Sequence, residues 1–316
     1  MTVTVATIEL LAPDGERCRC CRTVEDVFTV SQKTFRTVVG TALGSLSVII
    51  FTGALVRLTG SGLGCADWPR CSTTKFIDVS TGHTLIEQAN RLFTGVVSFS
   101  VIAAVLLAHF RKPLRRDLVL LAWGLVVGVL VQIVIGGVVV LTGLNPYANM
   151  AHFLVSLLLV ANAFVLFRRS GKEPDTYFRT GPQRLVTAVR LVVGSSSLAL
   201  VTGTVVTASG PHAGDENAVR LGFALTSVAR VHSVSVLITV ALIIFLAIRA
   251  KQLQGDASVT DAIQALLFAA VFQGAIGYAQ YFTGVPVALV AAHIVGATAL
   301  WFAVCNLAVS PSRGTL

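Results

Sequence analysis

Long uncharged stretches alternate with short polar segments along this chain. The uncharged stretches cover residues 37–56, 92–110, 118–167, 191–214, 231–248 and 262–312. A helix needs about 20 apolar residues to cross the hydrocarbon core of a bilayer. Stretches 118–167 and 262–312 are long enough for two helices each, and turn signals interrupt both, at Thr142–Pro146 and Thr283–Pro286. The pattern therefore predicts eight transmembrane helices.

The composition agrees with a membrane protein and argues against a soluble one. Hydrophobic residues make up 54% of the 316 residues and charged residues 12%, whereas soluble domains carry about 25% charged residues. We therefore predict an all-α integral membrane protein.

Lysine and arginine are distributed unequally between the two sides of the predicted membrane. With the N-terminus inside, 18 of the 24 basic residues fall on cytoplasmic segments, as the positive-inside rule requires. We expect a multi-pass protein of the plasma membrane with both termini in the cytoplasm. This asymmetry accounts for the net charge of +9, so the charge does not indicate a nucleic-acid partner.

The second half of the chain repeats the first. Five positions recur 141 residues later, so that Gln132, Gly136, Thr142, Gly143 and His152 correspond to Gln273, Gly277, Thr283, Gly284 and His293. Three more recur 150 residues later, so that Thr52, Gly53 and Gly60 correspond to Thr202, Gly203 and Gly210. An even number of helices per repeat gives both copies the same orientation, related by an axis along the membrane normal. The predicted fold is therefore two pseudo-symmetric four-helix bundles.

These patterns divide the chain into five segments. They are a cytoplasmic tail at 1–35, an N-terminal four-helix half at 36–168, a cytoplasmic linker at 169–183, a C-terminal four-helix half at 184–308 and a cytoplasmic tail at 309–316. The first tail contains Cys18, Cys20 and Cys21, whose thiols stay reduced in the cytoplasm. They form either an incidental cluster or a metal or lipid site.

Two histidines of the C-terminal half are candidate ligands. A charged group at the centre of a transmembrane helix costs about 2.5–3.5 kcal/mol, so an ionisable residue there is a candidate for function. His232 and His293 each lie a few residues inside the outer end of a helix, about 10 Å from the surface. Two imidazoles at one depth in a bundle can bind a haem iron from both sides. The alternative is that each ring is hydrogen-bonded to neighbouring backbone or hydroxyl groups.

The N-terminal half differs at the matching positions. His152 occupies the place of His293, but Asn90 stands where the other half has His232. Because an amide is a poor haem ligand, we expect this half to bind a haem through one imidazole. The open face of the iron would suit a substrate or reactive site.

A carboxylate shares this part of the N-terminal half. Glu87 lies three residues before Asn90, on the same helix face, so it would stand in the same pocket as the haem. The alternative is an ion pair between Glu87 and Arg91, one helical turn away. The two interpretations are compatible.

The first external loop contains Cys65 and Cys71, in a compartment that permits disulfides. A bridge between them would be either structural or a thiol-disulfide pair that moves electrons. Cys305 lies in an apolar helix and is expected in the core, and we assign no role to His109.

Several of these segments resemble the haem A synthases. In the first half they are Gly53–Cys65 with Cys71, Ile86–Arg91, and Gly143–Asn145 followed by His152. In the second half they are Thr202 with Gly203, Gly210–Asp215, His232 and His293. The resemblance covers nearly all of residues 36–308.

The resemblance implies an oxidoreductase that converts the C8 methyl group of haem O into the formyl group of haem A, through an alcohol, with oxygen from water. The product serves cytochrome c oxidase assembly, and a haem O farnesyltransferase is the other functional partner. The sequence does not identify the electron acceptor, and a homo-oligomer is compatible with it.

The resemblance also implies roles for individual residues. His232 and His293 would hold a haem b, His152 would face the substrate haem, and Glu87 would be the catalytic carboxylate. Cys65 and Cys71 would be the external cysteine pair of the family. The substrate pocket would include Asn90, Arg91 and Arg57.

Two features depart from the family pattern. Many members have a histidine at the position of Asn90, and His83, on the loop before it, is a weaker substitute. The second external loop, 209–223, lacks the cysteine pair that some members carry.

Two other classes of protein make different predictions. A di-haem electron-transfer protein would need similar haem sites at different depths, whereas all the candidate ligands here lie on the outer side of unequal halves. A transporter would interrupt its helices near the bilayer midplane, whereas the breaks at Thr142 and Thr283 lie at helix ends.

Overall fold

The computed structural model describes residues 29–172, 183–252 and 257–310. Within these ranges the chain forms α1 (Gln32–Leu58), α2 (Gly82–Phe110), α3 (Arg116–Leu141), α4 (Pro146–Ser170), α5 (Gln183–Ser209), α6 (Leu225–Gln252), α7 (Ala257–Phe282) and α8 (Val287–Ala308). All eight helices are long and apolar enough to cross a membrane, so the prediction of a multi-pass membrane protein is confirmed. Cys18, Cys20 and Cys21 lie outside the described residues.

Most helix ends lie several residues from the edges of the uncharged stretches, and two of them are informative. α1 begins at Gln32, because Ser31 caps it by accepting a hydrogen bond from the amide of Thr34 at 3.1 Å. α5 ends at Ser209, inside the uncharged stretch 191–214. Hydropathy alone shows neither the cap nor the loop that follows α5.

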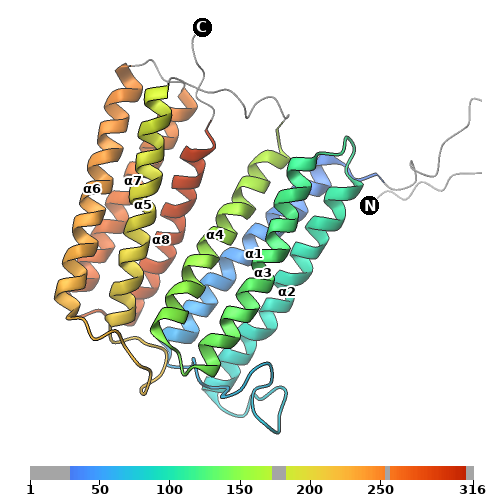
Figure 1. The fold of residues 1–316 in the computed structure, drawn as a ribbon, viewed down its shortest axis with the longest axis vertical. Helices are drawn as coiled ribbons and strands as arrows, with labels where there is room; N and C mark the ends of the chain where they lie inside the picture. Colours follow the sequence, from blue (N-terminus) through green and yellow to red (C-terminus); the bar gives the residue numbers. More distant parts are fainter. Residues whose placement is uncertain (1–28, 173–182, 253–256, 311–316) are drawn as a thin grey trace, which may run out of the picture.

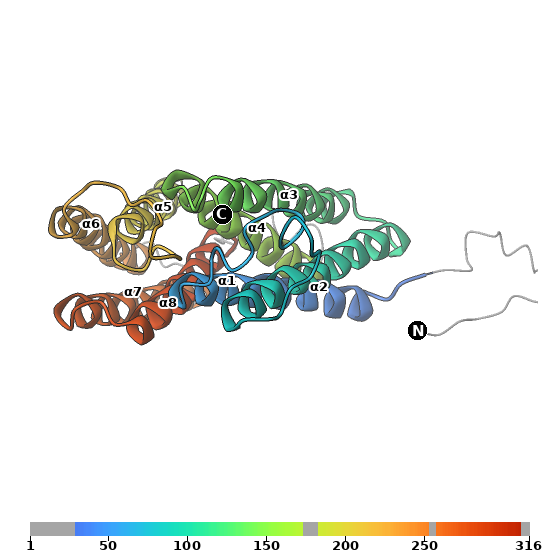
Figure 2. The same cartoon turned by 90° about the horizontal axis from the view of Figure 1, so that it is seen from below.

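The helices form two groups of four that lie side by side (Figure 1). In each group, helices that are consecutive in sequence pack together, and the first packs against the fourth. As a result, α2 and α4 are diagonally opposite in one bundle, as α6 and α8 are in the other. The bundles meet where α1 and α4 contact α8 and where α4 contacts α5 (Figure 2).

The two turns that join α3 to α4 and α7 to α8 have the same backbone. Each is a Schellman motif, with glycine and the following residue in the left-handed region: Gly143 and Leu144 at φ 61° and 63°, Gly284 and Val285 at 81° and 60°. The amide of Leu144 donates to Val139 O, and that of Val285 to Gln280 O, both at 2.8 Å. All three pairs of residues are 141 positions apart, which confirms the predicted repeat.

Side chains repeat this symmetry inside the bundles. Gln132 Nε2 donates to His152 O at 3.0 Å, and Gln273 Nε2 donates to His293 O at 2.7 Å. Each glutamine therefore fixes the helix that carries a candidate histidine. The outer surface is apolar instead, and Phe99, at 75% exposure, is typical of the side chains that face lipid.

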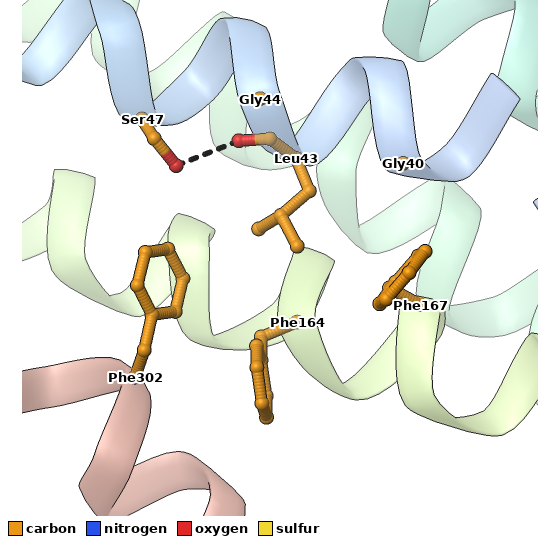
Figure 3. A pocket seen from close by; sticks show the side chains of 7 residues that line it. All are labelled: Gly40, Leu43, Gly44, Ser47, Phe164, Phe167 and Phe302. Atoms are coloured by element: carbon orange, nitrogen blue, oxygen red, sulfur yellow. Dashed lines mark hydrogen bonds between the residues drawn. The ribbon is translucent and has the colours of Figure 1, made fainter. Parts of the chain in front are cut away.

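An open apolar groove of about 440 Å³ runs along the junction of α1, α4 and α8 (Figure 3). Gly40 and Gly44 form its floor on α1, and Phe164, Phe167 and Phe302 line the other sides. Its one hydroxyl, on Ser47, donates to Leu43 O of the same helix at 2.8 Å. The groove therefore presents no unsatisfied side-chain polar group to the lipid.

A buried hydrogen bond joins the halves directly. Trp301 on α8 is 7% exposed, and its Nε1 donates to Leu157 O on α4 at 2.9 Å. This bond ties two helices that belong to different bundles.

We expect Trp301→Phe to destabilise the protein by about 1 kcal/mol, because the substitution removes a buried donor. The thermal midpoint in detergent should fall. Trp123→Phe is the matched control, since Trp123 is 49% exposed on α3. Equal shifts for the two variants would contradict a role for the inter-bundle bond.

Candidate functional site

The candidate residues lie toward the end of the bundles that carries the loops 59–81 and 210–224. Glu87 and Asn90 are in the first turns of α2, and His152 is in the second turn of α4. His232 and His293 are in the second turns of α6 and α8. Each half therefore contributes one pair of equivalent positions on two diagonally opposite helices.

In the C-terminal half, His232 is on α6 and His293 on α8. Each ring rests on a glycine of a neighbouring helix. A Cβ on Gly203 would lie 3.1 Å from His232 Cε1, and one on Gly277 would lie 3.0 Å from His293 Cε1. These contacts are tighter than side chains normally make, so glycine provides the room for both imidazoles.

The surroundings of these rings suit metal ligands. His232 Nδ1 is 3.1 Å from Thr202 Oγ1. Because the Thr202 hydroxyl donates to Ala199 O at 3.0 Å, we assign the Nδ1 proton to this bond, which leaves the lone pair on Nε2. His293 Nδ1 is buried and has no hydrogen-bond partner within the described residues. Each ring can therefore offer a nitrogen to iron, and the pair fits a haem.

The N-terminal half presents one imidazole. His152 rests on Gly136, where a Cβ would lie 3.4 Å from Cε1, and its Nδ1 is buried without a partner in the described part of the chain. Across the bundle, Asn90 Oδ1 accepts a hydrogen bond from Thr52 Oγ1 at 2.8 Å. His152 fits a haem iron as the other two histidines do, and Asn90 does not.

Glu87 is buried, at 4% exposure, and both of its oxygens have partners. Oε2 accepts a hydrogen bond from the amide of Cys65 at 2.7 Å. Oε1 accepts from Arg91 Nη2 at 2.5 Å and from Arg91 Nε at 3.0 Å. The predicted ion pair with Arg91 is confirmed, and such charge-assisted bonds fix the carboxylate strongly.

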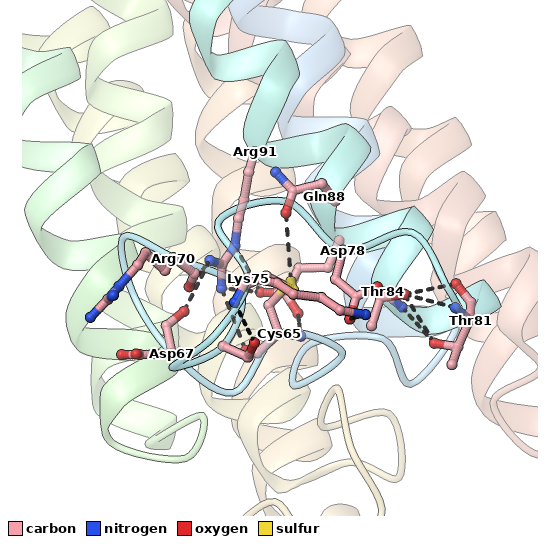
Figure 4. The surroundings of a disulfide bond; sticks show 12 residues. Cys65, Asp67, Arg70, Lys75, Asp78, Thr81, Thr84, Gln88 and Arg91 are labelled. Carbon is pink, nitrogen blue, oxygen red and sulfur yellow. Dashed lines mark hydrogen bonds and ion pairs between the residues drawn. A yellow bond between two sulfur atoms is a disulfide. The ribbon is translucent and has the colours of Figure 1, made fainter.

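The first external loop folds over this carboxylate. A disulfide joins Cys65 and Cys71, and both are almost completely buried. Arg91 also donates to Asp67 O at 3.0 Å and to Arg70 O at 3.2 Å, so it reaches into the loop from α2 (Figure 4). The bridge therefore closes the loop whose backbone holds Glu87. A redox role for the cysteines stays a prediction.

Two other sequence candidates make different contacts. Arg57 donates to His212 O and to Thr207 O, both at 2.7 Å, so its guanidinium connects the two halves. His83 is in the first turn of α2, and its predicted place on the preceding loop was wrong. Its Nδ1 is 2.9 Å from Ser61 Oγ, which anchors the loop.

The external loops of the two halves interlock. Between the halves, the amide of Gly62 donates to Gly214 O at 2.9 Å; within the C-terminal half, His212 Nε2 is 2.9 Å from Val285 O. Leu144 packs into the junction, because a Cβ on Gly62 or on Gly214 would lie within 3.1 Å of its side chain. The loops 59–81 and 210–224 are thus joined to each other and to the turns that precede α4 and α8.

Sequence reasoning missed the positioning residues. The sequence repeat contains Thr52 and Thr202, but it does not predict their bonds to Asn90 and His232. The repeat itself was the signal, since a threonine before glycine recurs beside each of these two positions. Gln88, whose Oε1 lies 3.7 Å from Cys65 Sγ, had no such signal.

The chain matches known proteins over most of its described length. Residues 36–305 match the family model COX15-CtaA, described as cytochrome oxidase assembly protein. A heme A synthase of Listeria monocytogenes serovar 1/2a is 34% identical over 160 residues, which are 50% of this chain and 51% of that protein.

Two further relatives carry the same name. A heme A synthase of Listeria welshimeri is 36% identical over 124 residues, 38% of this chain and 40% of that protein. One of Geobacillus kaustophilus is 33% identical over 123 residues, 38% of each chain. The matched segments thus span about half or less of these curated relatives.

We expect Gly64→Ala to disrupt the loop that holds Glu87. A Cβ at Gly64 would lie 2.5 Å from His83 O and 2.9 Å from Thr84 N. Backbone must therefore shift, at a cost of about 1–3 kcal/mol. The thermal midpoint and the fraction of bridged Cys65–Cys71, measured by peptide mapping, should both fall.

Gly82→Ala is the control for this substitution, because nothing lies within 4 Å of its added Cβ. It should leave the midpoint and the bridge unchanged. The same loss in both variants would show that the close approach at Gly64 is unimportant.

Proposed function

Because this chain belongs to the COX15-CtaA family of cytochrome oxidase assembly proteins, we propose that it is a haem A synthase. The reaction converts the C8 methyl group of haem O into the formyl group of haem A through an alcohol. One water supplies the oxygen; the substrate loses four electrons, and the substrate and the water together release four protons. The electrons pass to an external acceptor.

The observation that carries this proposal is the buried carboxylate of Glu87 in the half that offers a single imidazole. Glu87 can take a proton from the group being oxidised and stabilise positive charge that develops beside it. Arg91 and the amide of Cys65 keep the carboxylate in one orientation. Such fixed geometry is what general acid-base catalysis requires.

In this proposal the two halves have different tasks. His152 holds the substrate haem in the N-terminal half, in a pocket that includes Asn90 and Arg91. Arg57 acts on this pocket through the second loop, which it fixes. His232 and His293 hold a haem b, which supplies one-electron transfer when bound.

The proposed orientation follows from the basic residues. Both termini lie in the cytoplasm, and the loops 59–81 and 210–224 face outward from the plasma membrane. The site then lies near the external surface, where a disulfide between Cys65 and Cys71 can persist. A haem O farnesyltransferase supplies the substrate, and cytochrome c oxidase assembly uses the product.

The test is expression with a supply of haem O in a host that makes no haem A, followed by extraction and separation of the haems. We expect haem A or its hydroxymethyl precursor. Folded protein that yields only haem B and unreacted haem O would overturn the proposal. That result would favour a di-haem electron-transfer protein.

In the same assay, Glu87→Gln should lower haem A formation by at least about 100-fold, since a positioned acid-base group contributes about 10²–10⁴ in rate. The bound haem b spectrum should not change. Glu216→Gln, at an exposed glutamate of the second loop, should form haem A normally. Full activity in Glu87→Gln would remove Glu87 from the catalytic role.

His293→Ala should lose the haem b spectrum, because one of the two proposed iron ligands is gone. Absorption spectra of the purified protein measure this loss. His109→Ala is the control, since His109 is exposed at the other end of α2 and its Nδ1 bonds only Val105 O. An unchanged haem b spectrum in His293→Ala would exclude that ligand.

A further inference from the structure

The C-terminal half shows which residues accommodate an imidazole in this fold. On α5, Thr202 Oγ1 bonds His232 Nδ1 at 3.1 Å, and the adjacent Gly203 gives the ring its space. The threonine fixes the ring orientation and the glycine removes a clash. Together they form a seat for the residue at position 232 of α6.

The N-terminal half has the same seat. Thr52 and Gly53 on α1 correspond to Thr202 and Gly203, and Thr52 bonds the residue at position 90 of α2 at 2.8 Å. Nothing lies within 4 Å of a Cβ built on Gly53, whereas the His232 ring lies against Gly203. The shorter Asn90 therefore leaves free the space that an imidazole fills in the other half.

The bond to Thr52 also fixes which end of the Asn90 amide is available. The carbonyl oxygen Oδ1 accepts the threonine proton, so the Nδ2 hydrogens stay as donors. No hydrogen bond from Nδ2 occurs within the described residues, and Asn90 is only partly buried. In the repeat, Oδ1 of Asn90 takes the place of His232 Nδ1, because each of these atoms bonds the equivalent threonine.

A structural explanation accounts for only part of this arrangement. An asparagine that merely satisfied Thr52 would not need a glycine beside it, and it would not need an imidazole diagonally opposite. Asn90 on α2 and His152 on α4 stand in the same relation as His232 on α6 and His293 on α8. The repeat thus places Asn90 and His152 at equivalent positions of two diagonally opposite helices.

We propose that Asn90 determines the ligation of the substrate haem. His152 provides the single protein ligand of this half, and the amide held by Thr52 presents N–H donors to a small anion or solvent molecule on the opposite face. An iron with one imidazole is open to such a ligand, and an iron held by two imidazoles is closed. This inference rests on the proposed haem site of the N-terminal half.

The test uses ferric haem B bound to a chain that carries His232→Ala and His293→Ala, so that only the N-terminal site contributes. Absorption and electron paramagnetic resonance spectra report the spin state. We expect a high-spin haem in this parent and a low-spin haem when Asn90→His is added. A low-spin parent, or a bound haem that stays high-spin in Asn90→His, would overturn the inference.

Thr94→His is the matched control. Thr94 lies one turn further along α2, and its hydroxyl donates to the carbonyl of Asn90 at 3.4 Å. A histidine there adds an imidazole away from the Thr52–Gly53 seat, so the haem should stay high-spin. Conversion to low spin in this control would show that the seat is not specific.

Fluoride tests the donor, because a bound fluoride ion accepts hydrogen bonds. Removing a donor to a charged group should weaken fluoride binding about tenfold or more. Asn90→Leu should show this loss, and Thr52→Val should show a smaller one because the amide is no longer fixed. Unchanged fluoride affinity in Asn90→Leu would overturn the donor role.

The intact chain gives a second measurement if the double-alanine chain does not accumulate. In the intact chain, Asn90→His should raise the number of low-spin haems from one to two per chain. An unchanged number would contradict the inference. Haem A formation is measured separately on the unsubstituted chain. If the spin states are as expected but no haem A forms, the proposed reaction is wrong and the inference stands. If haem A forms but the N-terminal haem is low-spin, the inference is wrong and the proposed reaction stands.

Discussion

A polar atom inside these apolar bundles must find a partner, because lipid offers none and an unsatisfied group costs several kcal/mol. The protein meets this requirement with its loops and with paired helices. Glu87 takes its partners from Cys65 and Arg91, and Gln132 and Gln273 bond to backbone carbonyls of the next helix. Within the described residues, several buried side-chain atoms have no partner, among them Nδ1 of the candidate ligands His152 and His293 and Oε1 of Gln132 and Gln273.

The repeat supplies one framework, and a few positions make the halves unequal. Both halves keep the glutamine, the Schellman turn, the glycine under the imidazole and the threonine that bonds the facing residue. They differ where the chemistry would differ: Asn90 replaces histidine, and the loop 59–81 brings a disulfide over Glu87. The framework thus positions a pair of facing residues twice, and the loops determine what surrounds each pair.

Much of the fold could be predicted because it depends on local patterns. Uncharged stretches located the helices, and the Thr-Gly turns divided the two longest ones. The site could be predicted only in part. The 141-residue repeat identified the histidines, but the contacts of Arg57 with Thr207 and His212 join segments about 150 residues apart. Loop 59–81 has no periodicity, so the bond from the Cys65 amide to Glu87 and the placement of His83 required the folded chain.

The bond from Arg57 to Thr207 shows a consequence of joining both halves in one polypeptide. With the offset of 150, Thr207 is the counterpart of Arg57, so this arginine binds its own equivalent near the pseudo-symmetry axis. A homodimer of two identical N-terminal halves would bring two guanidinium groups to that axis, where like charges repel strongly in a medium of low dielectric constant. A single chain is free of this constraint, because its two halves can carry different residues at equivalent positions. Here one half has the arginine and the other has a threonine, which identical subunits cannot do.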